Sequence, residues 1–126
     1  MIMAKKYIPE MLDLIYIVGK EVYEHDTELS QYREKCERMG INWNSFRGWF
    51  VPAFRYMRNG VTLKGSIPQE ICKYMLERIY NEYGSEGLSL ALKSYIGTIR
   101  YYELKGKNKP GDRLIIQHFQ NLLNKS

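Results

Sequence analysis

The sequence predicts an all-α protein, a compact bundle of about six helices in a single domain over residues 1–126. Apolar residues recur at the three- and four-residue spacing of amphipathic helices over most of the chain. Glycine, serine and asparagine residues separate these periodic segments, and no alternating pattern is strong enough to indicate a sheet. Hydrophobic residues make up 44% of the chain and charged residues 26%, which is the balance of a folded protein rather than a disordered one.

The first two helices are predicted from their apolar spacing and their ends. Apolar residues repeat at helical spacing from Ile8 to about Tyr23, and acidic residues in the first turns complement the helix dipole. Thr27 or Glu28 opens a second helix. Gly40 closes that helix, because glycine readily adopts the left-handed conformation that follows a helix end.

A third helix carries a proline. Asn42 or Asn44 can cap its start, because asparagine is among the residues preferred at that position. Pro52 falls inside the helix, where it removes one hydrogen bond and crowds the preceding turn. We therefore expect a kink at Pro52, or a short helix followed by a separate piece over 53–58.

Three further helices are predicted after an extended linker at 61–65. A serine cap, a proline in the first turn and a glutamine three residues after the cap mark a helix start at 66–69. Gly84 ends this helix, and the serine that follows it caps the next one, which runs to about Glu103. A basic loop and the last helix follow at 105–123.

The segment at about 28–58 has the spacing of a helix-turn-helix. Cys36 takes the small-residue position where the two helices cross, and Gly40 takes the turn. Phe46 and Trp49 are among the apolar residues at the inward positions. The sequence therefore predicts a helix-turn-helix-like element within the bundle.

The same segment is strongly basic, although two residues depart from the motif. Lys35 stands where an apolar residue is expected, and Pro52 interrupts a recognition helix that is normally unbroken. No acidic residue occurs from position 38 to position 69. The five basic residues in this range equal the formal net charge of +5, and they are Arg38, Arg47, Arg55, Arg58 and Lys64.

We expect this basic surface to bind nucleic acid, and duplex DNA in particular. Arginine can grip a phosphate or a guanine edge, and asparagine can pair with adenine. Serine and the amide groups at a helix start suit phosphate oxygens. Phosphate contact from Arg47, Arg55 and Arg58 is expected ahead of base recognition by Asn44. The full set of candidate DNA-binding residues is Asn42, Asn44, Ser45, Arg47, Arg55, Arg58 and Lys64.

A second group of aromatic and basic residues lies near the C-terminal end of the chain. Tyr95, Tyr101 and Tyr102 can form a face that stacks on bases, or they can place their rings in the core and their hydroxyls at its rim, which is the commoner arrangement. The basic loop at 105–109 is either a second phosphate contact or simply solvated. Gly97, in the same predicted helix, indicates a close approach by another helix.

No set of residues indicates catalysis, so we expect a protein that is not an enzyme and has neither cofactor nor metal site. The chain contains two cysteines and two histidines, all far apart in sequence, whereas a zinc site needs about four ligands close together. Cys36 and Cys72 are expected to be small buried residues. No apolar run is long enough to cross a membrane and no signal peptide is evident, which predicts a cytoplasmic protein without a membrane partner.

The alternative function is a protein-interaction or dimerisation module with an aromatic docking surface. Tyrosine, tryptophan, methionine and arginine are enriched at protein interfaces, and the chain has 11 tyrosines. The positions of Trp43, Trp49 and Phe50 separate the two hypotheses. An exposed apolar patch formed by these three residues, away from the arginines, would favour a protein partner or a homodimer.

Several short segments resemble a small helical domain found at the N-terminus of some HNH-type restriction endonucleases. They are Val18–Tyr23, Gly40–Ser45, Phe54–Gly60, Tyr74–Leu88 and Ala91–Glu103, so the resemblance covers most of residues 8–104. It implies a DNA-binding or target-recognition module that delivers a nuclease located elsewhere in a longer chain. The paired histidines and the asparagine of an HNH site are not present in this sequence.

Overall fold

The computed structural model describes residues 7–125, and over this range it is built from helices and contains no strand. Five α-helices of seven or more residues form its main body, against the six expected. The all-α fold class is thus confirmed, with a slightly different number of helices. The main helices are α1 (Pro9–His25), α2 (Arg33–Met39), α4 (Val51–Asn59), α5 (Gln69–Leu104) and α6 (Pro110–Asn124).

The segment between α1 and α2 begins differently from the prediction. A 3₁₀ turn, η1 (Leu29–Tyr32), precedes α2, and the Glu28 carboxylate caps it by accepting a hydrogen bond from the Ser30 amide at 3.4 Å. The second predicted helix is therefore a 3₁₀ turn followed by a short α-helix. It ends at Gly40 as predicted, with φ at 80°.

Pro52 is accommodated by a wide turn rather than by a break. The short helix α3 (Trp43–Ser45) continues into a π-turn, η2 (Phe46–Phe50), and then directly into α4. Within this turn the Val51 amide donates to the Phe46 carbonyl, five residues back. The proline that follows has no amide hydrogen to donate, so the wider turn leaves fewer backbone groups without partners. The expected split into two separate pieces is wrong.

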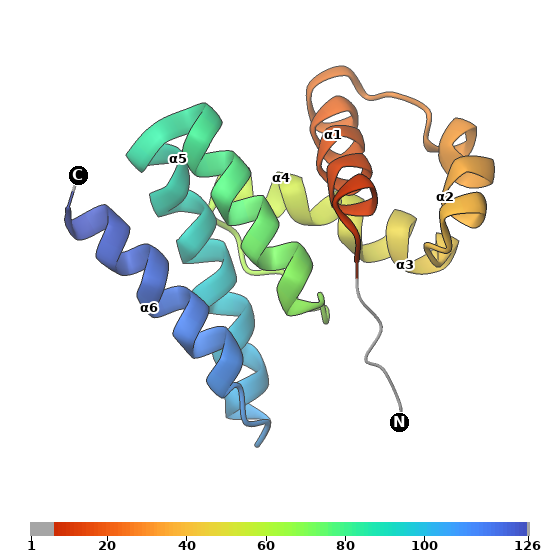
Figure 1. Cartoon of the computed structure of the whole chain (residues 1–126). Coiled ribbons are helices and arrows are strands. Elements are labelled where there is room, and N and C mark those ends of the chain that lie inside the picture. The colour runs from red at the N-terminus through yellow and green to blue at the C-terminus, as the bar shows by residue number, and fades with distance from the viewer. Residues whose placement is uncertain (1–6, 126) are drawn as a thin grey trace.

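α5 is a hairpin of two arms. Gly84 has φ 70° and ψ −161°, which is not helical, and it divides α5 into a first arm over 69–83 and a second arm over 85–104. The two arms run side by side in opposite directions (Figure 1). The two arms correspond to two of the predicted helices. Because the turn between them is tight, they count as the single element α5, which gives five helices instead of six.

α4 is the central element of the bundle. It packs against α1 on one side and against α5 on the other, while α6 packs along α5, and α2 and α3 lie at the far edge (Figure 1). The fully buried rings of Tyr16 and Phe54 pack edge to face between α1 and α4, with 5.3 Å between their centres. Gly19 permits this approach, because a Cβ atom there would lie 2.9 Å from the Phe54 Cβ. The fold thereby places the basic residues of α4 between α1 and α5.

Candidate nucleic-acid interface

The chain runs from helix α2 through a turn at Gly40 into the short helix α3, in the order of elements that the spacing predicts. Cys36 is fully buried at the crossing, and Ile41 and Phe46 are buried on the inner side. The Ile41 amide donates to the Cys36 carbonyl at 2.9 Å, which closes the turn behind Gly40. Lys35 points to solvent at the position where an apolar residue was expected. The helix-turn-helix element itself stays a prediction, because α2 spans less than two full turns and α3 has only three residues before the π-turn.

Asn42 is committed to helix capping. Its Oδ1 atom accepts a hydrogen bond from the Ser45 amide at 2.9 Å, so it is the N-cap of α3. Of the two cap residues considered, Asn42 is the one used. This hydrogen bond engages the side-chain oxygen of Asn42 and the backbone amide of Ser45, and both groups were expected to face DNA. What Asn42 can still offer a ligand is its side-chain NH₂ group.

Asn44 and Arg47 form an exposed pair one turn apart. The Arg47 Nη2 atom donates to Asn44 Oδ1 at 3.3 Å, and both side chains face solvent. Trp49 follows closely and is 43% exposed, although the motif predicted an inward position for it. Its ring lies against the backbone of Gly65, where an added Cβ would collide with it. Asn44 and Arg47 are therefore accessible members of the predicted site that lie next to each other.

Arg55 and Arg58 lie apart from this pair and from one another. Arg55 is exposed and lines a hollow of about 300 Å³ that also includes Asp26 from the end of α1. Arg58 is half-buried, with its guanidinium carbon 3.6 Å from the centre of the Tyr83 ring. Its Nε atom is buried and has no hydrogen-bond partner in the structure. Phosphate contact by Arg58 stays a prediction, and this position does not favour it.

The acid-free stretch of sequence does not form an acid-free surface. Arg38 lies 3.9 Å from Glu34, and the neighbouring Arg33 lies 3.4 Å from Glu37, so the acids of α2 offset cations at the turn. Exposed pairs of this kind contribute only about 0–1 kcal/mol each to stability, but they lower the positive potential nearby. The five cations of the stretch are thus dispersed over several environments.

Lys64 joins a different group of residues, which we call the lysine–tyrosine cluster: Lys64, Tyr101, Tyr102, Lys105 and Lys109. The ammonium groups of Lys64 and Lys105 lie 5.6 Å and 4.4 Å from the Tyr101 ring centre, and that of Lys109 lies 5.1 Å from the Tyr102 ring centre. The hydrogen bond to Lys105 lowers the pKa of the Tyr101 hydroxyl, and the charge of Lys64 acts in the same direction. Sequence reasoning noted the tyrosines and the basic loop separately and did not connect them with Lys64.

Tyr95 separates from the other two tyrosines of its helix. It is 2% exposed, and its hydroxyl donates to the buried carboxylate of Asp112. Burial raises its pKa. Tyr101 and Tyr102 are instead half-buried at the surface, with their rings 5.2 Å apart and edge to face. Tyr95 therefore has its ring in the core, whereas base stacking by Tyr101 and Tyr102 stays a prediction.

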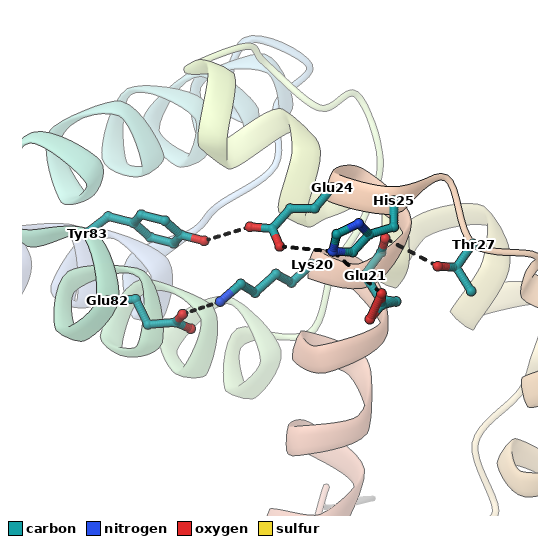
Figure 2. A network of polar contacts seen from close by, with 7 residues as sticks. All are labelled: Lys20, Glu21, Glu24, His25, Thr27, Glu82 and Tyr83. Carbon is teal, nitrogen blue, oxygen red and sulfur yellow. Dashed lines mark hydrogen bonds and ion pairs between the residues drawn. The ribbon is translucent and has the colours of Figure 1, made fainter.

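A network of polar contacts links the end of α1 to the hairpin turn of α5 (Figure 2). Lys20 pairs with Glu82, and the Tyr83 hydroxyl donates to Glu24 at 3.4 Å. The exposed His25 lies 3.9 Å from Glu24 and 3.8 Å from Glu21 (Figure 2). This network holds Tyr83, the ring on which Arg58 packs, and we assign it a structural role.

The remaining candidate groups for chemistry are buried or dispersed. Cys36 and Cys72 are buried free thiols, and burial raises the pKa of Cys36 to about 11. Within residues 7–125, no group of three or more histidine, cysteine or acidic side chains is arranged to hold a metal ion. None of the helices in the described part of the chain combines the length and apolar character needed to span a bilayer.

Over residues 7–125 the structure is that of a small all-helical protein, with exposed basic residues in two separate regions of its surface. Comparison of the chain with protein-family models, with curated proteins and with solved structures finds no match. The resemblance to a domain of HNH-type restriction endonucleases therefore stays a hypothesis. Any function assigned to the chain has to rest on its residues and their geometry.

Proposed function

We propose that this protein is a non-catalytic nucleic-acid-binding domain that contacts duplex DNA, mainly through phosphates. The observation that carries the proposal is the exposed pair of Asn44 and Arg47, directly after the turn that follows α2. Arg47 has five donor hydrogens in a planar fork, and one of its nitrogens contacts Asn44. The remaining donors suit a phosphate group or a guanine edge.

The geometry of the pair also favours exchange with a ligand. At 3.3 Å the bond between Arg47 Nη2 and Asn44 Oδ1 is long for a hydrogen bond, and it is exposed to solvent. Replacing it with a phosphate contact would therefore lose little. The Asn44 side-chain NH₂ group can donate to the same strand or to an adenine edge. Within this proposal Arg47 binds phosphate, Asn44 makes a secondary contact, and Asn42 keeps the helix start in place.

The test is a titration of a fluorescently labelled duplex at two salt concentrations. Binding should weaken steeply with salt, because each neutralised phosphate releases counterions. Arg47→Ala should weaken binding and lower the magnitude of the salt slope by about one. Lys73→Ala, which removes one exposed charge from the first arm of α5, is the matched control and should bind as the unmodified protein does. Absence of binding at low salt overturns the proposal.

The resemblance to domains of restriction endonucleases leads us to propose a targeting role as well. In that role the domain would select a site on DNA, and a nuclease elsewhere in a longer chain would cut it. The chain alone should then bind a duplex without cleaving it when Mg²⁺ is present. Cleavage by the purified chain that is lost in Arg47→Ala would show that the chain itself cuts DNA and would contradict the role.

A protein-interaction module is the second candidate, and a different surface favours it. Phe50 is buried and Trp43 stacks on the buried Phe46, so the aromatic patch that would have indicated docking is not formed by these residues. Leu104 and Leu114, however, are 82% and 68% exposed, and they adjoin the ion-paired residues Glu103 and Arg113 in sequence. Sedimentation that reveals a dimer, lost in a Leu104→Ser and Leu114→Ser double variant, would favour this candidate.

A further inference from the structure

We propose that the lysine–tyrosine cluster is a second binding site, for unpaired nucleic acid, with the lysines on phosphates and the aromatic rings on bases. This goes beyond the duplex contact proposed for Arg47. The cluster is assembled from three segments of chain: the linker before α5, the end of the second arm, and the residue before α6. Lys64 and Lys105 approach the same ring although 41 positions separate them.

The positive charge of the cluster is not offset by an ion pair within residues 7–125. In the part of the chain that the structure describes, none of its three lysines forms an ion pair with a carboxylate. The two acids closest to the cluster in sequence are engaged elsewhere: Glu103 pairs with Arg113, and the buried Asp112 accepts hydrogen bonds from Tyr95 and Gln69. Ammonium groups gathered in this way repel one another, and a bound anion relieves that repulsion.

The linker that carries Lys64 is held firmly in place. The amide of buried Leu63 donates to Thr98 Oγ1 at 3.1 Å, and Ser94 Oγ donates to the Val61 carbonyl at 2.6 Å. Both partners belong to the second arm of α5. On the other side of Lys64, the Trp49 ring lies against Gly65. Lys64 is thus positioned by the fold before any ligand arrives, which lowers the cost of binding.

The aromatic rings point to an unpaired strand. Tyr101 and Tyr102 lie beside the lysines at the surface, and the half-exposed Trp49 ring lies against Gly65, the residue that follows Lys64. Surfaces that combine cationic side chains with aromatic rings bind single strands, because the charges follow the backbone while successive bases stack. In a duplex the faces of the bases are already covered by their neighbours. The rings can therefore serve a strand whose bases are free, of either DNA or RNA.

The experiment measures the binding of a labelled oligothymidine and of a labelled duplex to the full chain by fluorescence anisotropy. A Lys64→Ala and Lys105→Ala double variant should bind the oligothymidine about tenfold more weakly and with a smaller salt slope, while its duplex affinity changes little. Tyr101→Leu should weaken oligothymidine binding and leave its salt slope unchanged, because it removes stacking but no charge. Arg47→Ala should show the reverse pattern, with the loss confined to the duplex. Lys73→Ala is the matched control.

Several outcomes would overturn the inference. Unchanged oligothymidine binding by the double variant, with an unchanged melting temperature, would show that the cluster is not the site. Equal losses for the oligothymidine and the duplex would show that it is not specific for unpaired strands. Competition by polyglutamate as effective as that by unlabelled oligothymidine of the same charge would indicate an acidic protein partner instead. Because Arg47 and the cluster are tested separately, failure of this inference leaves the duplex proposal intact, and the reverse also holds.

Discussion

The guanidinium carbon of Arg58 lies 3.6 Å from the centre of the Tyr83 ring, at the end of the first arm of α5. The Tyr83 hydroxyl in turn donates to Glu24 on α1. One arginine of α4 thus packs on a residue of α5 that is itself bonded to α1. The contact ties the hairpin turn to the centre of the bundle, and it explains why this cation is withdrawn from the surface on which the sequence placed it.

We predict that Arg58→Ala destabilises the protein more than it weakens DNA binding. The substitution removes a cation–π contact and the packing of a half-buried side chain, a loss of about 1–2 kcal/mol in the free energy of unfolding. Urea denaturation measures this loss, and Arg55→Ala, on the same helix but exposed, is the control with little expected effect. A stable Arg58→Ala variant with strongly reduced duplex affinity would restore Arg58 to the DNA-binding surface.

The displacement of Arg58 has a geometric cause that the sequence does not reveal. In a regular helix, Arg47 and Arg58 are eleven residues apart and lie within about 20° of the same face. The π-turn at Phe46–Phe50 acts as one extra residue and rotates everything after it by about 100° relative to what precedes it. Pro52 indicated that the helix would be irregular, but a proline is compatible with a kink, with a break and with a wide turn.

Local signals, in contrast, predicted several helix ends correctly, although the serine cap expected at Ser66 is wrong: α5 begins at Gln69 after Pro68, without a side-chain cap. Gly40 and Gly84 both have positive φ angles at the positions where helices were expected to end, and Asn42 caps α3. These features depend on residues close together in the chain, so the sequence contains the information. The contact of Lys64 with Tyr101 depends on how the linker packs against the second arm. No local pattern encodes that packing, and the lysine–tyrosine cluster was therefore missed.

Removal of the Asn42 cap should cost about 1 kcal/mol of unfolding free energy, because Asn42→Ala leaves the Ser45 amide without its acceptor. Asn42→Asp keeps an acceptor oxygen at the same place and should retain most of the stability. Thermal unfolding followed by circular dichroism distinguishes the two variants. If both unfold at the temperature of the unmodified protein, the cap contributes nothing.

Substitution of Gly97 by alanine should destabilise the protein by about 1–3 kcal/mol, although alanine normally favours a helix. A Cβ atom at this position would collide with the Thr62 side chain of the linker. The close approach predicted at Gly97 is therefore real, but it is made by the linker rather than by another helix. Gly48→Ala is the matched control: nothing lies within 4 Å of its added Cβ, and a gain of about 0.5–1 kcal/mol is expected. Urea denaturation of both variants measures the two changes in unfolding free energy, which should be a loss for Gly97→Ala and a gain for Gly48→Ala.

The buried thiol of Cys36 should make stability fall as the pH rises above about 8.5, the ordinary pKa of a cysteine. Burial, and then the charge of Glu37, raise the pKa of Cys36 to about 11 in the folded protein. Between these values the unfolded chain has lost the thiol proton while the folded chain retains it, so rising pH favours unfolding. Urea denaturation at pH 7.5 and at pH 9.5 should show a smaller decrease for Cys36→Ala than for the unmodified protein. Equal decreases would contradict this assignment.

The turn that presents Asn44 and Arg47 also belongs to the most lightly anchored part of the molecule. Among the described residues 29–39, Cys36 alone is fully buried, whereas α4 buries four of its nine residues. Amide hydrogens of α2 should consequently exchange with solvent through local opening, well before those of α4 exchange. If the proposed phosphate contact forms here, it would hold closed a segment that otherwise opens locally, and binding of a duplex should slow amide exchange in α2.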